Sequence, residues 1–352
     1  MPRKHVIRRI GSAAGTTALS LLALTAQAPA QDVTINVAQA YPASSAVLGH
    51  TPADLAEMLA VASGGTLQMK TFEPGALVPV LETFDAVAKG AVDAGYTAGT
   101  FWAGKDVTFN MYSAVPFGPA TEEYLAWMTE GGGLELQDEL YASHNLKSIL
   151  CGVVTPEAGG WFNKEINAVS DLDGLKMRFA GLGAQVIERV GVSPQLMAPG
   201  DIYAALDRGV IDATEFSTPA ADISLGFDEV AKYYYFPGWQ QQSAFAQLLI
   251  NLDLWNGLSD QHKTLIVMGC DAAIARTLAE GESLQAPALA EIASRGVEIR
   301  TFPAEVIDAL ESEWMAVTDE LTAKNENFKK AWDSYSAFRE SYAPWRDIGY
   351  LR

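Results

Sequence analysis

The sequence predicts an α/β protein of two similar lobes, followed by long C-terminal helices. Three observations support this: the length of the chain, an internal repeat of one helix-to-strand unit, and a largely helical pattern over the last quarter. With 352 residues, the chain is longer than one hydrophobic core usually organises, so two lobes are expected. Strand-like apolar runs alternate with helical patterns before residue 259, as in α/β proteins.

The internal repeat lies at Phe84–Ala94 and Tyr203–Ala213. Both segments carry, in the same order, an aromatic residue, an amphipathic stretch, a basic residue, a glycine and an Asp-Ala pair. This order is typical of a helix whose last-turn base complements the helix dipole, closed by a glycine with positive φ and followed by a strand. Gly90 and Gly209 are therefore the expected helix ends, and two copies indicate two similar lobes.

The first lobe is expected to begin with a strand at 33–37 and a helix at 44–63 that ends at two glycines. An alternating strand follows at 67–72, before the first repeat. A helix at 121–143 comes next. The apolar segment 148–154 predicts a buried strand that crosses into the second lobe.

The second lobe is expected to contain a strand at 176–179 ahead of the second repeat. The segment 245–251 predicts a strand that returns to the first lobe. From residue 259 onward the pattern is helical, apart from a strand at 297–302.

The predicted boundaries divide the chain into a leader at 1–30, two lobes and a C-terminal helical tail at 328–352. The first lobe takes 31–154 and about 241–285, and the second takes 155–240 and about 286–327. No Pro/Ser-rich linker separates the lobes. Crossing strands and helices are therefore expected to join them, as in a hinge.

The leader predicts export. Four basic residues precede the apolar run 18–24, which is too short to span a bilayer. Ala28 and Ala30 place cleavage before Gln31. The pair Arg8-Arg9 leaves the twin-arginine route open, although a plain basic leader is the favoured interpretation. No later stretch offers about 18 continuous apolar residues.

The chain is strongly acidic. Its formal net charge is −19, and removal of a leader with four basic residues and no acid brings the charge to about −23. This charge argues against nucleic acid and anionic membrane surfaces as partners.

Cys151 and Cys270 are the two cysteines of the chain. Export permits a disulfide between them. Two buried free thiols are the favoured alternative, because free cysteine packs as a small hydrophobe.

Two segments, in order along the chain, resemble those of substrate-binding proteins of tripartite ATP-independent periplasmic (TRAP) transporters. They are Gly174-Leu-Lys-Met-Arg178 and the segment from Pro199 to Ala213. The resemblance covers most of the chain after the leader. It implies a periplasmic-binding-protein-like fold with a hinge, a periplasmic location, and delivery of a small organic carboxylate to TRAP membrane permease subunits.

Three further segments are similar to the branch of that family that binds 2-oxo or 2-hydroxy acids, such as pyruvate or lactate, together with a metal cation. These segments are Glu157–Phe162, Thr214–Phe216 and Tyr234–Trp239. The alternative within the family is a longer or aromatic carboxylate bound without metal. An enzyme is the alternative of another class. It is not favoured, because no zinc-ligand spacing of histidines and no Gly-x-Ser-x-Gly motif occurs after the leader.

Arg178 is the first candidate for binding the ligand. An arginine in an apolar strand needs a partner, and its planar fork matches a carboxylate. From chemistry alone, a structural ion pair with an acid of the same lobe is equally expected. The resemblance favours a carboxylate clamp.

Glu215 and Glu157 are the candidate ligands for a hard cation, Na⁺ or Ca²⁺, which prefers oxygen donors. Glu215 follows the strand of the second repeat, and ligands of α/β sheets gather at the carboxyl ends of strands. The resemblance adds the carbonyl of Phe216. The family usually has Gln at position 157 and an acid at position 241, where this chain has Gln241, so we hypothesise that the two departures offset each other in charge.

Phe101 and Thr100 follow the strand of the first repeat, and Trp239 and Gln242 lie beside a Pro-Gly turn. Aromatic walls with a few amides suit the cleft of a small ligand. Packing in the core is an equally expected role for Phe101. The resemblance implies a tyrosine hydroxyl near position 101, which this chain lacks, and Thr100 is its expected replacement.

The C-terminal tail carries an aromatic stripe at helical spacing, and such a stripe must pack on its own lobe or on a partner. The residues are Trp332, Tyr335, Phe338, Tyr342 and Trp345. Because some members of the resembled branch dimerise through C-terminal helices, a two-fold homodimer is favoured over a tail that folds back.

Overall fold

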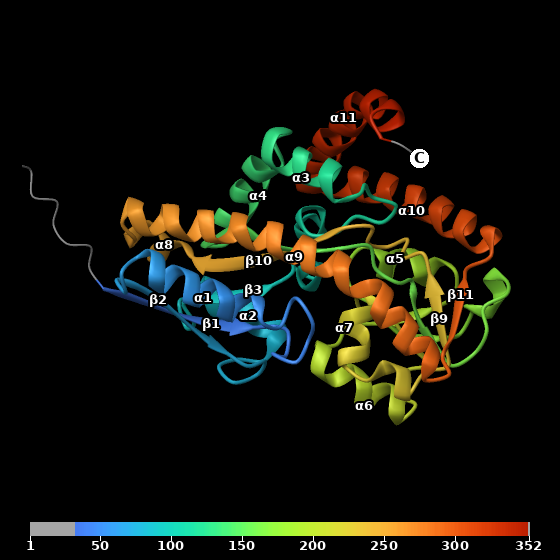
Figure 1. Cartoon of the computed structure of the whole chain (residues 1–352). Coiled ribbons are helices and arrows are strands. Elements are labelled where there is room, and N and C mark those ends of the chain that lie inside the picture. The colour runs from blue at the N-terminus through green and yellow to red at the C-terminus, as the bar shows by residue number, and fades with distance from the viewer. Residues whose placement is uncertain (1–31, 351–352) are drawn as a thin grey trace, which may run out of the picture. The chain divides into compact units, whose positions relative to one another are not determined.

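The structure, a computed structural model, describes residues 32–350. The predicted leader at 1–30, its predicted cleavage before Gln31 and the route of export therefore lie outside the described residues. Two mixed β-sheets with helices packed on them form the fold (Figure 1), which confirms the predicted α/β class. No helix among residues 32–350 is long and apolar enough to cross a membrane.

The first sheet has the strand order β2-β1-β3-β10-β4, and the second has the order β11-β9-β5-β8-β6-β7. Strand β10 runs antiparallel to both β3 and β4. We use lobe I for the first sheet with its helices and lobe II for the second. The strands are β1 Val33–Gln39, β2 Leu67–Phe72, β3 Ala94–Thr97, β4 Leu146–Val154, β5 Gly160–Phe162, β6 Lys176–Arg178, β7 Ser193–Gln195, β8 Ala213–Thr214, β9 Tyr233–Phe236, β10 Ala244–Asn251 and β11 Glu298–Thr301.

The helices surround these sheets, and two short 3₁₀ helices, η2 Gly99–Trp102 and η3 Val107–Tyr112, follow β3. The α-helices are α1 Thr51–Ala62, α2 Thr83–Ala88, α3 Thr121–Glu130, α4 Gly133–Ala142, α5 Gly183–Arg189, α6 Ile202–Asp207, α7 Pro219–Ser224, α8 Leu252–Gly257, α9 Asp260–Ser294, α10 Ala304–Lys324 and α11 Glu326–Ile348.

The internal repeat forms the same structure in both lobes. It comprises α2 and β3 in lobe I and α6 and β8 in lobe II, with positive φ at Gly90 (71°) and Gly209 (66°) between helix and strand. Asp93 accepts a hydrogen bond from the backbone N–H of Asn36 on β1 at 2.8 Å. Asp212 accepts one from the N–H of Lys176 on β6 at 2.9 Å. The repeated aspartate thus ties each repeat to the neighbouring parallel strand.

Two predicted helices differ from the structure. The helix expected at 44–63 begins at Thr51, because the segment before it turns, with φ 64° at Val47. The helix expected at 121–143 is two helices, α3 and α4, which are separated at Gly131 and Gly132; the φ of 91° at Gly132 does not fit a continuous helix.

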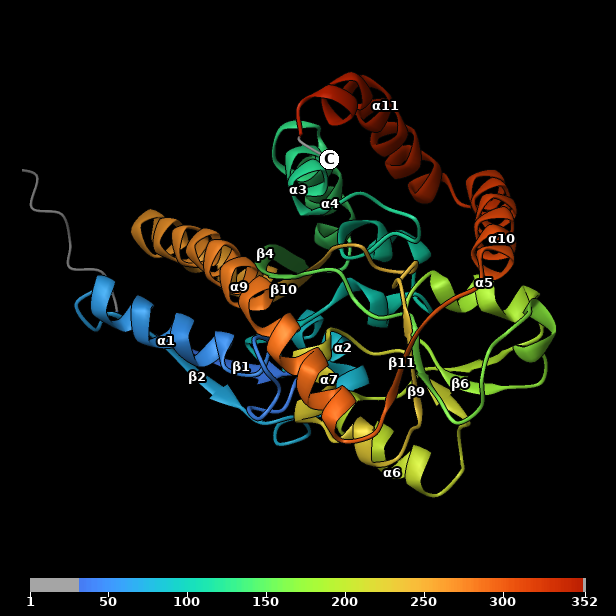
Figure 2. The ribbon, with the colours of Figure 1, turned by 45° about the vertical axis from the view of Figure 1, so that its right-hand side comes forward.

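Helix α9 connects the two lobes. It packs on α1 and β4 of lobe I and on α7 of lobe II, and Figures 1 and 2 both show it extending from one sheet to the other. The chain also crosses between β4 and β5 and between β9 and β10. This connectivity agrees with the prediction that several segments, not a single linker, join the lobes.

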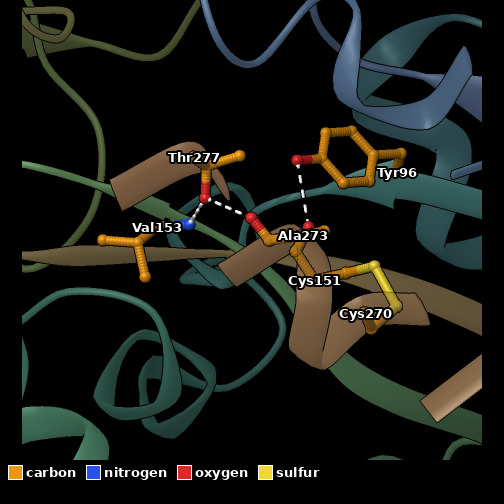
Figure 3. The surroundings of a disulfide bond; sticks show 6 residues. All are labelled: Tyr96, Cys151, Val153, Cys270, Ala273 and Thr277. Atoms are coloured by element: carbon orange, nitrogen blue, oxygen red, sulfur yellow. Dashed lines mark hydrogen bonds between the residues drawn. A yellow bond between two sulfur atoms is a disulfide. The ribbon is translucent and has the colours of Figure 1, made fainter. Parts of the chain in front are cut away.

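The preference for two free thiols is wrong. Cys151 on β4 and Cys270 on α9 form a disulfide with a Cα–Cα distance of 4.3 Å (Figure 3). The packing of α9 on β4 brings together two residues that are 119 positions apart, which spacing alone does not reveal. The hydroxyl of Thr277 on the same helix accepts a hydrogen bond from the N–H of Val153 at 2.8 Å. The disulfide thus joins α9 to the strand that leads out of lobe I.

Removal of this disulfide is expected to destabilise the fold. The variant Cys151→Ala/Cys270→Ala should lose about 2–4 kcal/mol of the free energy of unfolding, because the unfolded chain is no longer constrained by a long closed loop. Urea denaturation followed by circular dichroism measures this loss, with reductant-treated wild-type protein as the matched control. Equal unfolding midpoints, together with two reactive thiols in the untreated protein, would contradict the disulfide.

The tail folds back on its own chain. Helix α11 packs on α3, α4 and α10, and Figure 2 shows it beside α3 and α4. Tyr335 is buried, with its ring 5.1 Å from that of Trp127. Trp332 contacts Trp314 of α10 at 5.7 Å. The aromatic stripe is therefore partly internal, whereas Trp345 at its far end is 56% exposed.

Candidate ligand-binding site

The site lies in a cavity lined by residues of both lobes. Its volume is about 410 Å³, including space open to solvent. Most of its polar residues stand at or just beyond the carboxyl ends of strands, as the rule for α/β sheets predicts. Tyr41, Thr100 and Phe101 come from lobe I, Arg178, Phe216 and Ser217 from lobe II, and Glu157 and Gln241 from the two crossings.

Arg178 ends β6 and is buried. Its Nη1 donates to a carboxylate oxygen of Glu215 at 2.9 Å and to the Glu215 carbonyl at 2.7 Å. The same carboxylate oxygen, Oε1, accepts the N–H of Ala180 at 2.6 Å. The ion pair that chemistry alone suggested is therefore present. Arg178 lines the cavity, whereas its partner Glu215 is not among the lining residues.

Three charged atoms of this cluster lack a hydrogen-bond partner. They are Nε of Arg178, Oε2 of Glu215 and Oε2 of Glu157, and all three are buried. Buried polar groups are nearly always satisfied, so each such atom calls for an explanation. Oxygens of two carboxylates and a guanidinium nitrogen around one cavity match a cation together with a carboxylate ligand.

The two glutamates repel each other. Burial, followed by the charges of Glu215 and Asp222, raises the pKa of the Glu157 carboxyl well above its ordinary value. Burial also raises the pKa of Glu215, although Arg178 and the hydrogen bond from Ala180 oppose this effect. A bound cation between them would supply the positive charge that allows both carboxylates to ionise.

The donor set for such a cation is formed entirely of oxygens. Glu157, Phe216 and Gln241 line the cavity, and the unpartnered oxygen of Glu215 belongs to the same cluster. Among residues 32–350, no group of three or more His, Cys, Asp or Glu side chains could hold a metal ion. A set of two carboxylates, a carbonyl and an amide would suit Na⁺ or Ca²⁺ better than a transition metal.

Asp222 of α7 supports the strand end that carries Glu215 and Phe216. It accepts hydrogen bonds from Trp161 Nε1 and Tyr234 hydroxyl, both at 2.8 Å, and from the N–H of Ser217 at 3.0 Å. Burial raises the pKa of Asp222 to about 7. These hydrogen bonds to Asp222 hold the segment after β8 in place.

The backbone links the two crossings at the cavity. Glu157 donates its N–H to the carbonyl of Gln241 at 3.3 Å, and its carbonyl accepts the N–H of Gly238 at 3.0 Å. The segment after β4 therefore pairs with the segment before β10. Glu157 and Gln241, two candidate cation ligands, therefore lie on the segments that connect the lobes.

Three predicted site residues are not among those that line the cavity: Glu215, which pairs with Arg178, and Trp239 and Gln242. Trp239 packs between the rings of Phe117 and Phe179, each at 5.7 Å, which is a core position. Gln242 donates to the carbonyl of Gly238 at 2.8 Å and serves the turn. Both are neighbours of Gln241 in sequence, and only Gln241 lines the cavity.

Tyr41 and Ser217 also line the cavity, although the sequence patterns did not single them out. Tyr41 lies two residues beyond the end of β1, and Ser217 follows the Glu215–Phe216 pair. The strand-end rule that identified Glu215 would also have found Tyr41, had it been applied to the first strand.

Two α/β lobes that the chain crosses several times, with a charged cavity lined by both, define a two-lobed solute receptor. Comparison with known proteins agrees. Residues 37–325 match the family model described as bacterial extracellular solute-binding protein, family 7. A "monocarboxylate 2-oxoacid-binding periplasmic protein" of Nostoc sp. is 33% identical over 100% of this chain and 97% of its own length. The chain therefore belongs to this family of extracellular solute-binding proteins, and its resemblance to TRAP solute-binding proteins is confirmed.

Two solved structures of TRAP solute-binding proteins have the same fold. The protein from Bordetella bronchiseptica, a mixed-occupancy dimer with calcium and picolinate, is 33% identical with a TM-score of 0.89, over 90% of this chain and 95% of that one. The protein from Pseudoalteromonas atlantica, with sodium and pyruvate, is 30% identical with a TM-score of 0.85, over 90% of this chain and 96% of that one.

Proposed function

We propose that this chain is a periplasmic receptor that captures a small 2-oxo or 2-hydroxy monocarboxylate, pyruvate-like or lactate-like, together with Na⁺ or Ca²⁺. The observation that supports this proposal is a cavity lined by buried Arg178 and Glu157, with Glu215 paired to Arg178, in which one oxygen of each glutamate has no hydrogen-bond partner. A receptor is proposed in place of an enzyme because the chain belongs to a family of extracellular solute-binding proteins.

Arg178 binds the ligand carboxylate, because its guanidinium retains Nε without a partner beside the cavity. Glu215, Glu157, the Phe216 carbonyl and the Gln241 amide hold the cation, and the cation neutralises the two acids and attracts the oxygens of the ligand. Thr100 and Phe101 form the wall contributed by lobe I. Trp239 and Gln242 support Gln241 through the turn at Gly238 and do not contact the ligand.

Ligand binding brings the lobes together. The crossings at Glu157 and Gln241 and helix α9 form the hinge, and a ligand that contacts both lobes favours the closed state. The closed receptor then delivers the carboxylate to TRAP membrane permease subunits. The 2-oxoacid-binding relative from Nostoc supports a carboxylate ligand. The two solved structures, one with calcium and picolinate and one with sodium and pyruvate, support a carboxylate together with a cation of either kind.

A thermal-shift screen of ligand-free protein tests this function. Pyruvate at 100 times its Kd should stabilise the folded state by about 2.7 kcal/mol in buffer with Na⁺ or Ca²⁺. Isobutyrate, which lacks the 2-oxygen, and succinate, which carries a second charge, are the controls and should have little effect. A shift only with longer or aromatic carboxylates, independent of the cation, would favour the metal-free alternative.

A homodimer through the far end of α11 is the proposed assembly. Although Tyr335 is covered within the chain, Trp345, Ile348 and Tyr350 are exposed by 56%, 84% and 45%. Such a patch usually marks an interface. The dimeric solved structure from Bordetella bronchiseptica supports this proposal.

Light scattering at micromolar concentration should report about twice the mass of one mature chain, because two exposed patches cover each other. The variant Trp345→Glu/Ile348→Glu should be a monomer that still binds ligand, whereas Val61→Glu, at a similarly exposed site on α1, should remain dimeric. Point substitutions are preferable to truncation after Lys330, which would also remove buried Tyr335. A monodisperse wild-type monomer would refute the dimer.

A further inference from the structure

The phenol of Tyr41 is a buried polar group to which the proposed function assigns no role. Tyr41 follows β1 in lobe I and lines the ligand cavity. The residue is 6% exposed, and its hydroxyl has no hydrogen bond to another described residue. The hydroxyl is not among the fully buried unpartnered atoms, so it is open to the cavity and free to donate a hydrogen bond to a bound ligand.

Aromatic packing holds the Tyr41 ring in place. Its centroid lies 6.2 Å from that of Tyr96, in an edge contact, and 6.3 Å from that of Phe101. Both neighbours are themselves buried. A ring packed in this way presents its hydroxyl without losing much conformational freedom when a ligand binds.

The charged groups of the site act on this hydroxyl. Burial and the neighbouring Tyr96 raise the pKa of Tyr41, the charges of Glu157 and Glu215 raise it further, and Arg178 lowers it. The phenol therefore keeps its proton at neutral pH and can donate it in a hydrogen bond. It faces the same cluster that would bind the cation and the carboxylate.

We infer that Tyr41 is the hydrogen-bond donor by which lobe I recognises the ligand, in the cavity that Arg178 of lobe II also lines. This inference rests on the proposed function. Ser113, another hydroxyl of lobe I in the lining, already donates to the carbonyl of Phe245 at 3.0 Å. The methyl group of Thr100 lies against Gly181 of lobe II. A donor from lobe I makes binding depend on closure, because the ligand then contacts both lobes.

Calorimetric titration of Tyr41→Phe with pyruvate, in Na⁺- or Ca²⁺-containing buffer, tests this role. The Kd should rise about 10-fold to 100-fold, because a hydrogen bond to a charged ligand is lost. The thermal midpoint of the ligand-free variant should not fall, since the removed hydroxyl has no partner. Tyr235→Phe is the matched control. Its hydroxyl accepts the N–H of Ile166 at 2.8 Å, away from the cavity, so stability should fall while affinity is retained.

The double variant Tyr41→Phe/Phe101→Tyr returns a phenol to the neighbouring ring and should recover part of the lost affinity. Native affinity in Tyr41→Phe would overturn the inference while leaving the proposed function in place. An affinity loss that parallels a fall in ligand-free stability would also overturn it, in favour of a structural role. Failure of the wild-type protein to bind any 2-oxo acid would overturn both proposals.

Discussion

Replacing Arg178 with alanine is expected to weaken the binding of pyruvate by about 2–5 kcal/mol. The ligand carboxylate would lose its cationic partner in a buried site, and Glu215 would be left there without its ion pair. Calorimetry on the folded variant measures this loss. Arg178→Lys should also bind weakly, because an ammonium group cannot replace the planar fork.

Arg178→Ala could lose affinity because the ion pair with Glu215 is broken and the fold is disturbed. A second variant separates this structural role of Arg178 from its role in binding the ligand. Arg178→Ala/Glu215→Gln removes both buried charges, so it should be more stable than Arg178→Ala. It should nevertheless fail to bind. Arg276→Ala, at an arginine whose side chain is 58% exposed, is the control for general charge effects. Near-native affinity in Arg178→Ala would contradict the clamp.

Removal of the cation is expected to weaken ligand binding about as much as the Arg178→Ala substitution does. In metal-free, Na⁺-free buffer, the affinity for small 2-oxo acids should fall at least about 100-fold, which is about 3 kcal/mol. The physical reason is that Arg178 would then be the one positive charge of the cluster to balance Glu157, Glu215 and the ligand carboxylate. Circular dichroism should show an intact fold, and calorimetric titration measures the affinity.

Adding back Na⁺ and Ca²⁺ separately identifies the ion. Glu215→Gln should weaken binding and abolish its dependence on the cation, whereas Glu165→Gln, at a half-exposed acid of lobe II, should change neither. Unchanged affinity in cation-free buffer would instead support the metal-free alternative.

The architecture was largely predictable because one local pattern occurs twice. The helix, glycine, strand and aspartate of each repeat are encoded within eleven residues, and both copies form the expected unit. Asp93 and Asp212 even accept hydrogen bonds from equivalent neighbouring strands. The break between α3 and α4 depended on Gly131 and Gly132, where sequence alone suggested one continuous helix.

Contacts between distant segments were less predictable. Nothing in the sequence around Cys151 and Cys270 indicates that α9 packs on β4, which is the contact that allows the disulfide. The contacts of the C-terminal tail were equally hard to predict from sequence. A stripe of aromatic residues requires a cover, but its periodicity does not specify whether α3 or a second chain provides it.

At the site, strand ends were a better guide than neighbours in sequence. Glu215, Thr100 and Phe101 were expected after strand ends, and all three belong to the cavity lining or its charged cluster. Arg178 was expected within a strand, and it ends β6 at the cavity. Trp239 and Gln242 were chosen because they flank a turn, and the turn directs only Gln241 to the cavity.

Mass spectrometry of the ligand that co-purifies with the native protein tests the central claim most directly. Protein purified without added carboxylates is denatured, and the released small molecules and metal content are quantified together. We expect a 2-oxo or 2-hydroxy monocarboxylate and Na⁺- or Ca²⁺-dependent retention of that ligand. Release of a dicarboxylate, a sugar or an amine, or of a carboxylate whose retention ignores both cations, would contradict the account.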